Sequence, residues 1–223
     1  MKSLKPTNKR LPAHGLYAIT DAQLTPEERL YEMVAKAIEG GAVMIQYRNK
    51  NADAAQRERE ARLLSDVCLA HSIPLIINDS VDLAQRVGAQ GVHLGGTDAP
   101  IHEARALLGD HAIIGISCYN EFQRALRAQQ AGADYVAFGS FHPTATKSGT
   151  VRATIELLHE ARKYLSIPMV AIGGITPENG RPIVQAGATL VAACQGVFGQ
   201  GDVQFAAQKY AHLFTAVGNT LVV

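Results

Sequence analysis

The sequence predicts an α/β protein, a single-domain (β/α)8 TIM barrel, and three observations support this prediction. Strand-like and helix-like segments alternate along the whole chain, as they do when helical crossovers join parallel strands. A motif of helix, glycine and strand recurs at Gly41, Gly88, Gly132 and Gly187, and its spacing of 44 to 55 residues suits two strand–helix units. The length of 223 residues also fits, because one α/β barrel commonly has roughly 200–250 residues.

Eight strands and eight helices can be placed in order. The strands, which are short apolar runs, are expected at residues 15–20, 42–47, 74–78, 91–94, 112–117, 134–139, 168–172 and 189–194. The helices, which carry apolar residues at helical spacing, are expected at residues 26–40, 53–71, 80–87, 101–108, 120–131, 150–165, 177–186 and 202–214. Thr25 is the expected N-cap of the first helix and Pro26 its first residue. The alternative fold, an open doubly wound sheet, has fewer strands and one dominant glycine-rich switch point.

The composition indicates one folded unit that binds small molecules. Hydrophobic residues make up 47% of the chain and the mean hydropathy is +0.01, which suits one large core. A basic arm over residues 1–13, without the apolar region of a signal peptide, is expected to precede a barrel domain over residues 14–223. The net charge is +1, and charged residues of both signs are scattered along the sequence. No apolar stretch approaches the ~18 residues of a membrane span. We therefore expect a cytoplasmic protein without nucleic-acid or membrane partners.

Three cysteines, Cys68, Cys118 and Cys194, lie far apart in apolar segments. Their spacing is not that of a zinc site or of a secreted disulfide framework. We expect them to be buried thiols of a reducing compartment.

Polar residues stand where the predicted strands end, and barrels of this type carry their chemistry there. In the second strand, alternation places Gln46 and Arg48 on one face, and Lys50 continues this polar series. The apolar and aromatic residues of the same strand, Val43, Ile45 and Tyr47, are expected on the other face. Cationic groups at an inward strand end favour an anionic ligand, and the alternative is an arginine that extends outward into solvent.

Two carboxylates follow neighbouring strands. Asp79 comes directly after the third strand, and Asp98 follows the fourth in the loop Gly95-Gly96-Thr97-Asp98. Carboxylates beside a diphosphate are a usual way to hold Mg²⁺. The alternative is that each aspartate caps the helix that follows it. Their joint position opposite cationic residues favours the metal site.

The stretch from Tyr135 to Gly149 changes from an apolar strand into a loop of hydroxyls, one lysine and glycines. Thr144 and Thr146 offer hydroxyl donors, Lys147 offers a mobile positive charge, and glycine lets backbone N–H groups approach oxygen atoms. Phosphate or diphosphate is the natural ligand of such a loop. An ordinary surface turn is the alternative, because it uses the same residue types.

Two further strand ends add candidates to the same rim. Ser117 ends the fifth strand, and Gly173-Gly174 ends the seventh, ahead of the helix-start signal at residues 176–178. The backbone amides of the glycine pair, together with a helix N-terminus, predict a second phosphate site of the kind that many barrels have. The alternative is that these glycines only make a tight turn.

Five motifs, in order and over nearly the whole chain, resemble the thiamine phosphate synthase family. They are Gln46-x-Arg48-x-Lys50, Ile77-Asn78-Asp79, Gly91-Val-His93-Leu-Gly95, Thr144-x-Thr146-Lys147 and Ala171-Ile-Gly173-Gly174-Ile175. The resemblance implies a (β/α)8-barrel transferase of thiamine biosynthesis. Such an enzyme joins 4-amino-5-hydroxymethyl-2-methylpyrimidine diphosphate to 4-methyl-5-(2-phosphoethyl)thiazole, or to its 2-carboxy form, and releases diphosphate. The resemblance also implies Mg²⁺ as cofactor.

The resemblance assigns roles by motif. It implies that the pyrimidine diphosphate is bound by Gln46, Arg48, Lys50, Asn78, Ser117 and Lys147, and that Mg²⁺ is bound by Asp79 and Asp98. It implies a thiazole phosphate pocket formed by Thr144, Ala145, Thr146, Gly174, Cys194 and Gln195. The catalytic candidates are Arg48, Lys50, Ser117 and Lys147. It further implies that diphosphate leaves before the thiazole nitrogen attacks, a course that needs charge stabilisation and positioning and no nucleophilic side chain.

Three residues depart from the family pattern. Gly96, Tyr119 and Gln195 stand where the family commonly has Gln, His and Ser. Two alternatives therefore stay open: a thiazole tautomerase, which is a relative on the same barrel, and a non-catalytic barrel that binds a thiamine precursor. The retained Lys147 and both aspartates favour the synthase. The expected partners are small-molecule substrates, and assembly into a homo-oligomer stays open.

Overall fold

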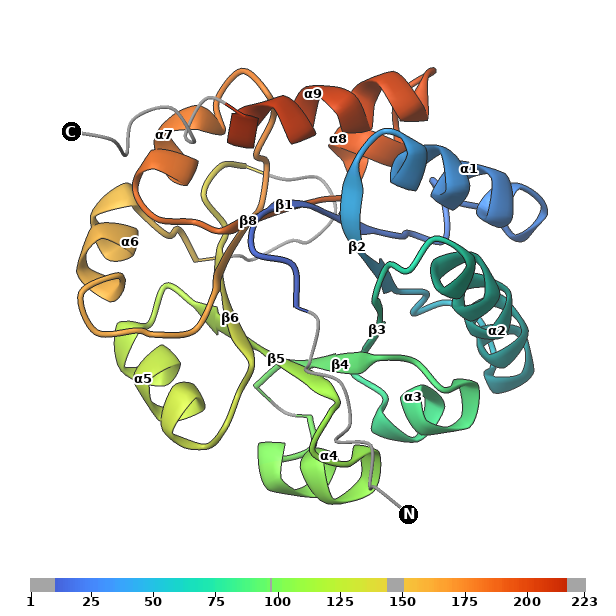
Figure 1. The fold of residues 1–223 in the computed structure, drawn as a ribbon, viewed down its shortest axis with the longest axis horizontal. Helices are drawn as coiled ribbons and strands as arrows, with labels where there is room; N and C mark the ends of the chain where they lie inside the picture. The colour runs from blue at the N-terminus through green and yellow to red at the C-terminus, as the bar shows by residue number, and fades with distance from the viewer. Residues whose placement is uncertain (1–10, 97, 144–150, 216–223) are drawn as a thin grey trace, which may run out of the picture.

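The structure is a computed structural model in which residues 11–96, 98–143 and 151–215 are described. It shows the predicted fold, a closed barrel of eight parallel strands in sequence order with helices around it (Figure 1). The strands are β1 (Gly15–Ile19), β2 (Ala42–Tyr47), β3 (Leu75–Asn78), β4 (Gly91–Leu94), β5 (Ile113–Tyr119), β6 (Tyr135–Gly139), β7 (Met169–Ile172) and β8 (Leu190–Ala193). The strand predictions are confirmed to within two residues at each end.

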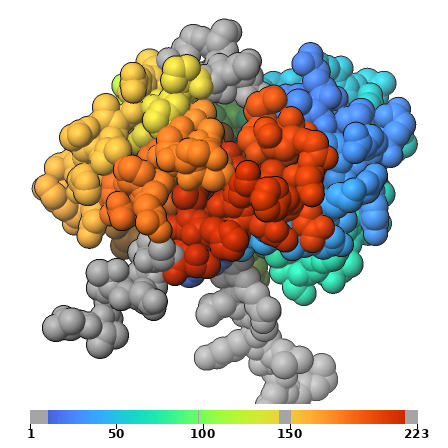
Figure 2. All heavy atoms as spheres, turned by 90° about the horizontal axis from the view of Figure 1, so that it is seen from above, coloured from blue at the N-terminus to red at the C-terminus, as the bar shows by residue number. Residues whose placement is uncertain are grey.

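The helices pack against the outside of the barrel. They are α1 (Glu27–Glu39), α2 (Ala54–Ala70), α3 (Val81–Val87), α4 (Ile101–Leu108), α5 (Phe122–Gln130), α6 (Ile155–Ala161), α7 (Arg181–Gln185), α8 (Gln195–Phe198) and α9 (Val203–Thr215). The last helix, α9, lies beside the first, α1, and completes the ring (Figures 1 and 2). None of the described helices is long and apolar enough to cross a membrane.

The helix starts lie within two residues of the prediction except those of α6 and α7, and α6 also ends at Ala161 rather than at residue 165. Local hydrogen bonds explain three of the differences at helix starts. The Thr25 hydroxyl donates to the Asp21 carbonyl oxygen at 2.8 Å, so it closes the turn after β1 and Pro26 becomes the N-cap of α1. Residues 151–153 stay extended because Ser140 exchanges backbone hydrogen bonds with Val151 and Ala153, and α6 begins only after its cap Thr154.

The third difference concerns α7, predicted over residues 177–186 and observed over Arg181–Gln185. The Asn179 side chain accepts from the Thr176 amide at 2.8 Å and donates to the Gly174 carbonyl oxygen at 3.0 Å. These bonds hold residues 176–180 as a turn, because asparagine side chains compete with the backbone for hydrogen bonds. The short helix α8 was not predicted at all.

The core has two parts. A smaller cluster fills the barrel interior and includes Tyr17, Met44, Ile76 and Tyr135. A larger cluster lies between the strands and the helices and contains Ile45 and Tyr47, as predicted for the outer face of β2. Val43, predicted on that same face, packs instead against the interior cluster at the start of β2, beside the register shift that follows Leu16 in β1.

All three cysteines are free thiols, as expected. Cys68 and Cys118 are buried, and Cys194 is only partly buried. The prediction of an N-terminal arm falls mostly on residues 1–10, which lie outside the described residues, and it stays a prediction.

Candidate active site

The carboxyl ends of the parallel strands meet at one rim of the barrel, and most of the candidate residues lie there. The structure describes Gln46, Arg48, Lys50, Asn78, Asp79, Asp98, Ser117, Gly174, Cys194 and Gln195. Thr144, Ala145, Thr146 and Lys147 lie outside the described residues. The rim combines cationic groups, carboxylates and backbone turns rich in glycine.

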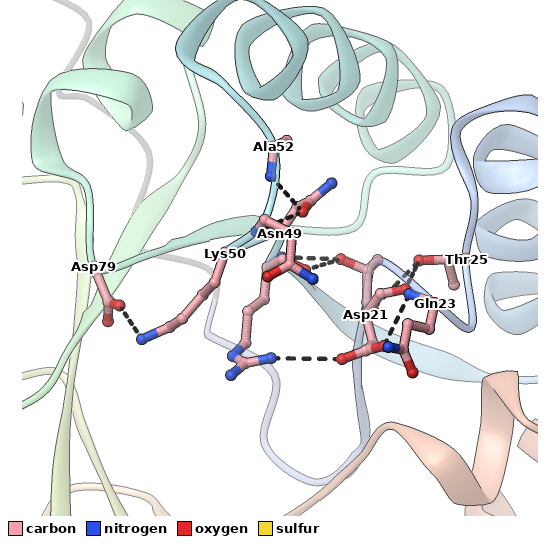
Figure 3. Close-up of polar contacts among 10 residues, drawn as sticks. Asp21, Gln23, Thr25, Asn49, Lys50, Ala52 and Asp79 are labelled. Carbon is pink, nitrogen blue, oxygen red and sulfur yellow. Dashed lines mark hydrogen bonds and ion pairs between the residues drawn. The ribbon is translucent and has the colours of Figure 1, made fainter. Parts of the chain in front are cut away.

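Two cations extend from the end of β2 and each is held by a carboxylate. Arg48 Nη1 lies 3.6 Å from Asp21 Oδ2, and Lys50 Nζ lies 2.9 Å from Asp79 Oδ2 (Figure 3). The Thr20 hydroxyl accepts from the Arg48 amide at 2.9 Å and fixes the backbone at this point. Exposed ion pairs contribute only about 0–1 kcal/mol, so an anionic ligand can replace Asp79 as the partner of Lys50, whose side chain is 58% exposed. The Arg48–Asp21 pair is more buried, with side-chain exposures of 25% and 18%. The sequence analysis missed Asp21, whose only signal is its place directly after the first strand.

The β2–α2 loop that carries Lys50 is tied to a buried carboxylate. Glu60 of α2, with 3% of its surface exposed, accepts from the Tyr47 hydroxyl at 2.6 Å and from Asn49 Nδ2 at 3.0 Å. Gln56 Nε2 donates to its other oxygen at 2.8 Å. Asn49 therefore points toward the helix while Lys50 points across the rim toward Asp79 (Figure 3).

Asp79, directly after β3, and Asp98, in the loop after β4, lie beside each other at the rim. Asp79 follows β3 in the left-handed backbone region, with φ of 62°, which aspartate tolerates better than most residues. Asp98 Oδ2 accepts from the Gly95 amide at 2.5 Å. Burial and then the neighbouring Asp79 carboxylate raise the pKa of Asp98. Two carboxylates so close repel each other, and a divalent cation would relieve that repulsion.

Neither aspartate caps a helix, so that alternative is wrong. Ser80 caps α3, because its hydroxyl accepts from the Leu83 amide at 3.2 Å. Pro100 stands at the N-cap of α4, and this cap has no side-chain hydrogen bond. Within the described part of the chain, no group of three or more His, Cys, Asp or Glu residues is placed to hold a metal. The aspartate pair can therefore supply only part of a coordination shell, and this suits Mg²⁺, which keeps several waters and binds substrate phosphates.

A cavity of about 630 Å³ opens beside Asp79, on the side of the strand ends that faces α2, α3 and α4. Lys50, Asn78 and Asp79 line it together with Arg57 of α2 and residues of α3 and α4, whereas Gln46, Arg48, Asp98 and Ser117 do not line it. The cavity brings a cation, an amide and a carboxylate to one space large enough for a small molecule.

The glycine pair after β7 lies against the start of the β6–α6 loop, as predicted. Gly173 and Gly174 have φ of 99° and 60°, and a Cβ atom on them would collide with Ser140 and with the Pro143 carbonyl oxygen, respectively. The His142 amide donates to the Gly173 carbonyl oxygen at 2.9 Å. Pro143 is the last described residue before Thr144, so the described start of the β6–α6 loop adjoins the glycine pair.

The predicted helix N-terminus at this second phosphate site is wrong. The Thr176 amide is already bound by Asn179, and α7 begins only at Arg181. A different short helix, α8, begins at the rim instead, directly after β8. Short extra helices near the end of the eighth strand are common at barrel phosphate sites. Four residues are too few for a periodic pattern, so this helix could not be predicted from the sequence.

Cys194 and Gln195 lie at the start of α8. Burial raises the pKa of the Cys194 thiol to about 12, so this thiol is neutral near pH 7 and is suited to lining a pocket. The Gln195 side chain is exposed and runs along α8, because a Cβ atom on Gly199 would collide with its Nε2 atom.

The other two departures from the family pattern, Gly96 and Tyr119, lie near each other. Arg124 of α5 donates to the Ser117 carbonyl oxygen at 2.7 Å and its guanidinium lies 5.5 Å from the centre of the Tyr119 ring. A Cβ atom on Gly96 would lie 3.5 Å from Tyr119 Oη and 3.6 Å from Arg124 Nη2. Both distances are ordinary van der Waals contacts, so Gly96, Tyr119 and Arg124 are neighbours at the rim. Arg124 is an additional cation there that was not predicted from the sequence.

Inside the barrel, a chain of hydrogen bonds joins two predicted substrate-binding residues, Gln46 and Ser117. Gln46 Nε2 donates to Tyr17 Oη at 2.6 Å, and the hydroxyls of Tyr17 and Tyr135 lie 3.0 Å apart. His93 Nδ1 lies 2.9 Å from Tyr135 Oη, and its Nε2 lies 2.9 Å from Ser117 Oγ. The sequence analysis gave no role to the three middle residues, since only the barrel register shows that they face one another.

The fold and this rim define a class, a (β/α)8-barrel enzyme whose strand ends gather cations, carboxylates and glycine-rich turns. The family model described as thiamine monophosphate synthase matches residues 16–197, and the chain belongs to this family. It is 51% identical over 200 residues to a thiamine-phosphate synthase of Nitrosococcus oceani (90% of this chain, 92% of that one). It is 49% identical over 208 residues to that of Thioalkalivibrio sulfidiphilus (93% and 98%). A solved thiamine phosphate pyrophosphorylase of Pyrococcus furiosus matches with a TM-score of 0.82 and 35% identity, over 92% of this chain and 97% of that one.

Proposed function

We propose that this member of the family joins 4-amino-5-hydroxymethyl-2-methylpyrimidine diphosphate to 4-methyl-5-(2-phosphoethyl)thiazole, or to its 2-carboxy form. The products are thiamine phosphate and diphosphate. Thiamine-phosphate synthases are transferases that use small-molecule substrates, and the relatives' names support this reaction. The observation that supports it most is that Lys50 and Asp98 both lie next to Asp79 at the rim, where Lys50 and Asp79 also line a cavity.

The cations at the end of β2 have the role of holding the diphosphate. Negative charge on the diphosphate grows as its bond to carbon breaks, and fixed cations stabilise that charge more in the transition state than in the ground state. Arg48 and Lys50 are placed for this, and Lys147, outside the described residues, is proposed to join them. Ser117 and Asn78 would hold the pyrimidine part, and the neutral Cys194 thiol takes no part as nucleophile.

Asp79 and Asp98 are proposed to bind Mg²⁺. The donor set fits, because both ligands are carboxylates, they repel each other, and neither is used as a helix cap. When bound, Mg²⁺ would neutralise charge on the leaving diphosphate. Lys50, which contacts Asp79 in this structure, would then be released to the diphosphate oxygens.

The thiazole phosphate is proposed to bind between the β6–α6 loop and the ends of β7 and β8. Gly174, Cys194 and Gln195 are the described residues of this pocket, and Thr144, Ala145 and Thr146 are the proposed remainder. The enzyme's main task is to hold both substrates in line, since a positioned pair reacts far faster than a free one. A cytoplasmic location and the absence of a nucleic-acid partner remain predictions, and the oligomeric state stays open.

The test is a product assay with purified protein, Mg²⁺ and both substrates. Formation of thiamine phosphate and diphosphate is the expected result. Isomerised thiazole without diphosphate would instead identify a tautomerase, and tight binding of either substrate without turnover would identify a non-catalytic binding protein.

A further inference from the structure

The three middle residues of the interior hydrogen-bond chain, Tyr17, Tyr135 and His93, have no role in the proposed reaction, yet they are closely packed inside the barrel. Tyr17 and Tyr135 are 1% and 0% exposed. Their rings meet edge to face, with centroids 6.1 Å apart, and the His93 ring stacks on Tyr135 at 5.5 Å. Gly115 of β5 leaves room for this arrangement, because a Cβ atom there would collide with the Tyr135 ring. The side chains of this hydrogen-bond chain are therefore held rigidly, and their atoms can be assigned donor and acceptor roles.

The donor and acceptor in each bond of this hydrogen-bond chain can be assigned by starting at Gln46. An amide nitrogen can only donate, so Tyr17 Oη accepts from Gln46 Nε2. Either hydroxyl could donate in the contact between Tyr17 and Tyr135. Among the described residues Tyr135 Oη is the one acceptor that Tyr17 Oη contacts, so the proton of the buried Tyr17 hydroxyl is assigned to this bond. Tyr135 then donates to His93 Nδ1, which must carry no proton. The remaining imidazole proton sits on Nε2 and is donated to Ser117 Oγ. Burial raises the pKa of both tyrosines above its ordinary value, which keeps both hydroxyls protonated as this order requires.

We propose that this ordered chain sets the hydrogen-bonding polarity of the pyrimidine site, with Tyr17, Tyr135 and His93 as positioning residues. At one end, the bond from Gln46 Nε2 to Tyr17 fixes the orientation of the amide, so that Gln46 Oε1 can accept a hydrogen bond from the substrate. At the other end, Ser117 Oγ already accepts from His93, so its own proton is directed to the substrate. An aminopyrimidine matches this polarity, since its amino group donates and its ring nitrogens accept. The inference rests on the proposed function and adds the means by which the site distinguishes an aminopyrimidine from a hydroxypyrimidine.

A measurement of the His93 tautomer tests the assigned donors and acceptors directly. In protein labelled with ¹⁵N-histidine, NMR should show His93 with a bare Nδ1 and a protonated Nε2, the signal being assigned by its loss in His93→Gln. Tyr135→Phe removes the donor to Nδ1 and should abolish this preference, while Tyr31→Phe, at an exposed position on α1, should leave it unchanged. Thermal unfolding of each variant checks that the fold is retained.

A protonated Nδ1 in the unaltered protein, in either the other tautomer or the doubly protonated ring, would overturn the proposal. So would a folded Tyr135→Phe variant whose His93 tautomer is unchanged. Because this readout needs no substrate, it stands or falls separately from the proposed enzymatic activity.

A binding experiment tests the consequence for specificity. The unaltered protein should bind 4-amino-5-hydroxymethyl-2-methylpyrimidine diphosphate about 10–100-fold more tightly than the 4-hydroxy analogue, whose keto form reverses one donor and one acceptor. Tyr135→Phe should lower this ratio by about tenfold without altering the affinity for inorganic diphosphate. An unchanged ratio would contradict the proposal, whereas failure of the unaltered protein to bind either pyrimidine would contradict the proposed function.

Discussion

Lys50 keeps 58% of its side chain exposed although it lies 2.9 Å from the Asp79 carboxylate. An ion pair this exposed contributes little to folding, so its positive charge is available to a diphosphate. We expect Lys50→Ala to lower kcat by about 10²–10³-fold, the usual effect of removing one preorganised electrostatic group, with little change in the thermal unfolding midpoint. Steady-state kinetics would measure this. Lys36→Ala is the matched control, because Lys36 is a comparably exposed lysine paired with Glu32 within α1, and normal kinetics in Lys50→Ala would refute the assignment.

Gln195 is the family departure closest to the proposed thiazole phosphate pocket. Its side chain is exposed and extends along α8 toward Gly199, so little should depend on its amide. We expect Gln195→Ser to preserve or raise kcat/KM for the thiazole phosphate. A loss of more than about tenfold, equivalent to ~1.4 kcal/mol of transition-state binding, would show that Gln195 makes a specific contact with the substrate.

At the scale of elements, the turn after β7 depends on Gly173. Its left-handed backbone and the nearby Ser140 side chain each exclude a Cβ atom. Gly88, at the C-cap of α3, isolates the first effect, since it is also left-handed but has open space around it. We expect Gly88→Ala to destabilise the protein by about 1–2 kcal/mol and Gly173→Ala by about 2–5 kcal/mol. Urea unfolding would measure both changes in stability, and steady-state kinetics should show a raised KM for the thiazole phosphate in Gly173→Ala alone. Equal effects of the two substitutions would argue against close packing between the turn after β7 and the β6–α6 loop.

The strands and the longest helices, α1, α2 and α9, could be predicted from the sequence. The helices follow hydrophobic periodicity, and the short strands are apolar runs that several times follow a glycine at the end of a helix, so both signals lie within the segment itself. The starts of α6 and α7 could not be read, because the hydrogen bonds of Ser140 and Asn179 decide them. The aspartates after β3 and β4 were predictable from their positions at strand ends. The Tyr17, Tyr135 and His93 contacts were not, since each needs the register between strands that are far apart in the sequence.

For the whole molecule, barrel closure is what turns scattered residues into one site. β1 pairs with β8 and α9 packs beside α1, so strand ends from residue 19 to residue 193 share one rim. Asp21 after β1 and Cys194 after β8 are close enough for the Asp21 carboxylate to act on the Cys194 pKa. Cations from β2, carboxylates from β3 and β4, and glycines from β7 thereby surround a common space.

The proposed Mg²⁺ requirement depends on the whole barrel, because its two proposed ligands follow different strands, β3 and β4. We expect Asp98→Asn to raise the Mg²⁺ concentration needed for half-maximal activity by about tenfold or more, equivalent to ~1.4 kcal/mol of binding free energy. The asparagine oxygen can still accept from the Gly95 amide as Asp98 does, so folding should be unaffected. Asp66→Asn, on α2, is the control and should leave the Mg²⁺ midpoint unchanged.

The most direct test of the account is a single-turnover reaction of both substrates in protein freed of metal by EDTA and then titrated with Mg²⁺. The account predicts no thiamine phosphate without Mg²⁺, and equal amounts of thiamine phosphate and diphosphate once Mg²⁺ is restored, with Asp98→Asn shifted to higher Mg²⁺. Full activity in EDTA, or thiazole isomerisation without release of diphosphate, would contradict it.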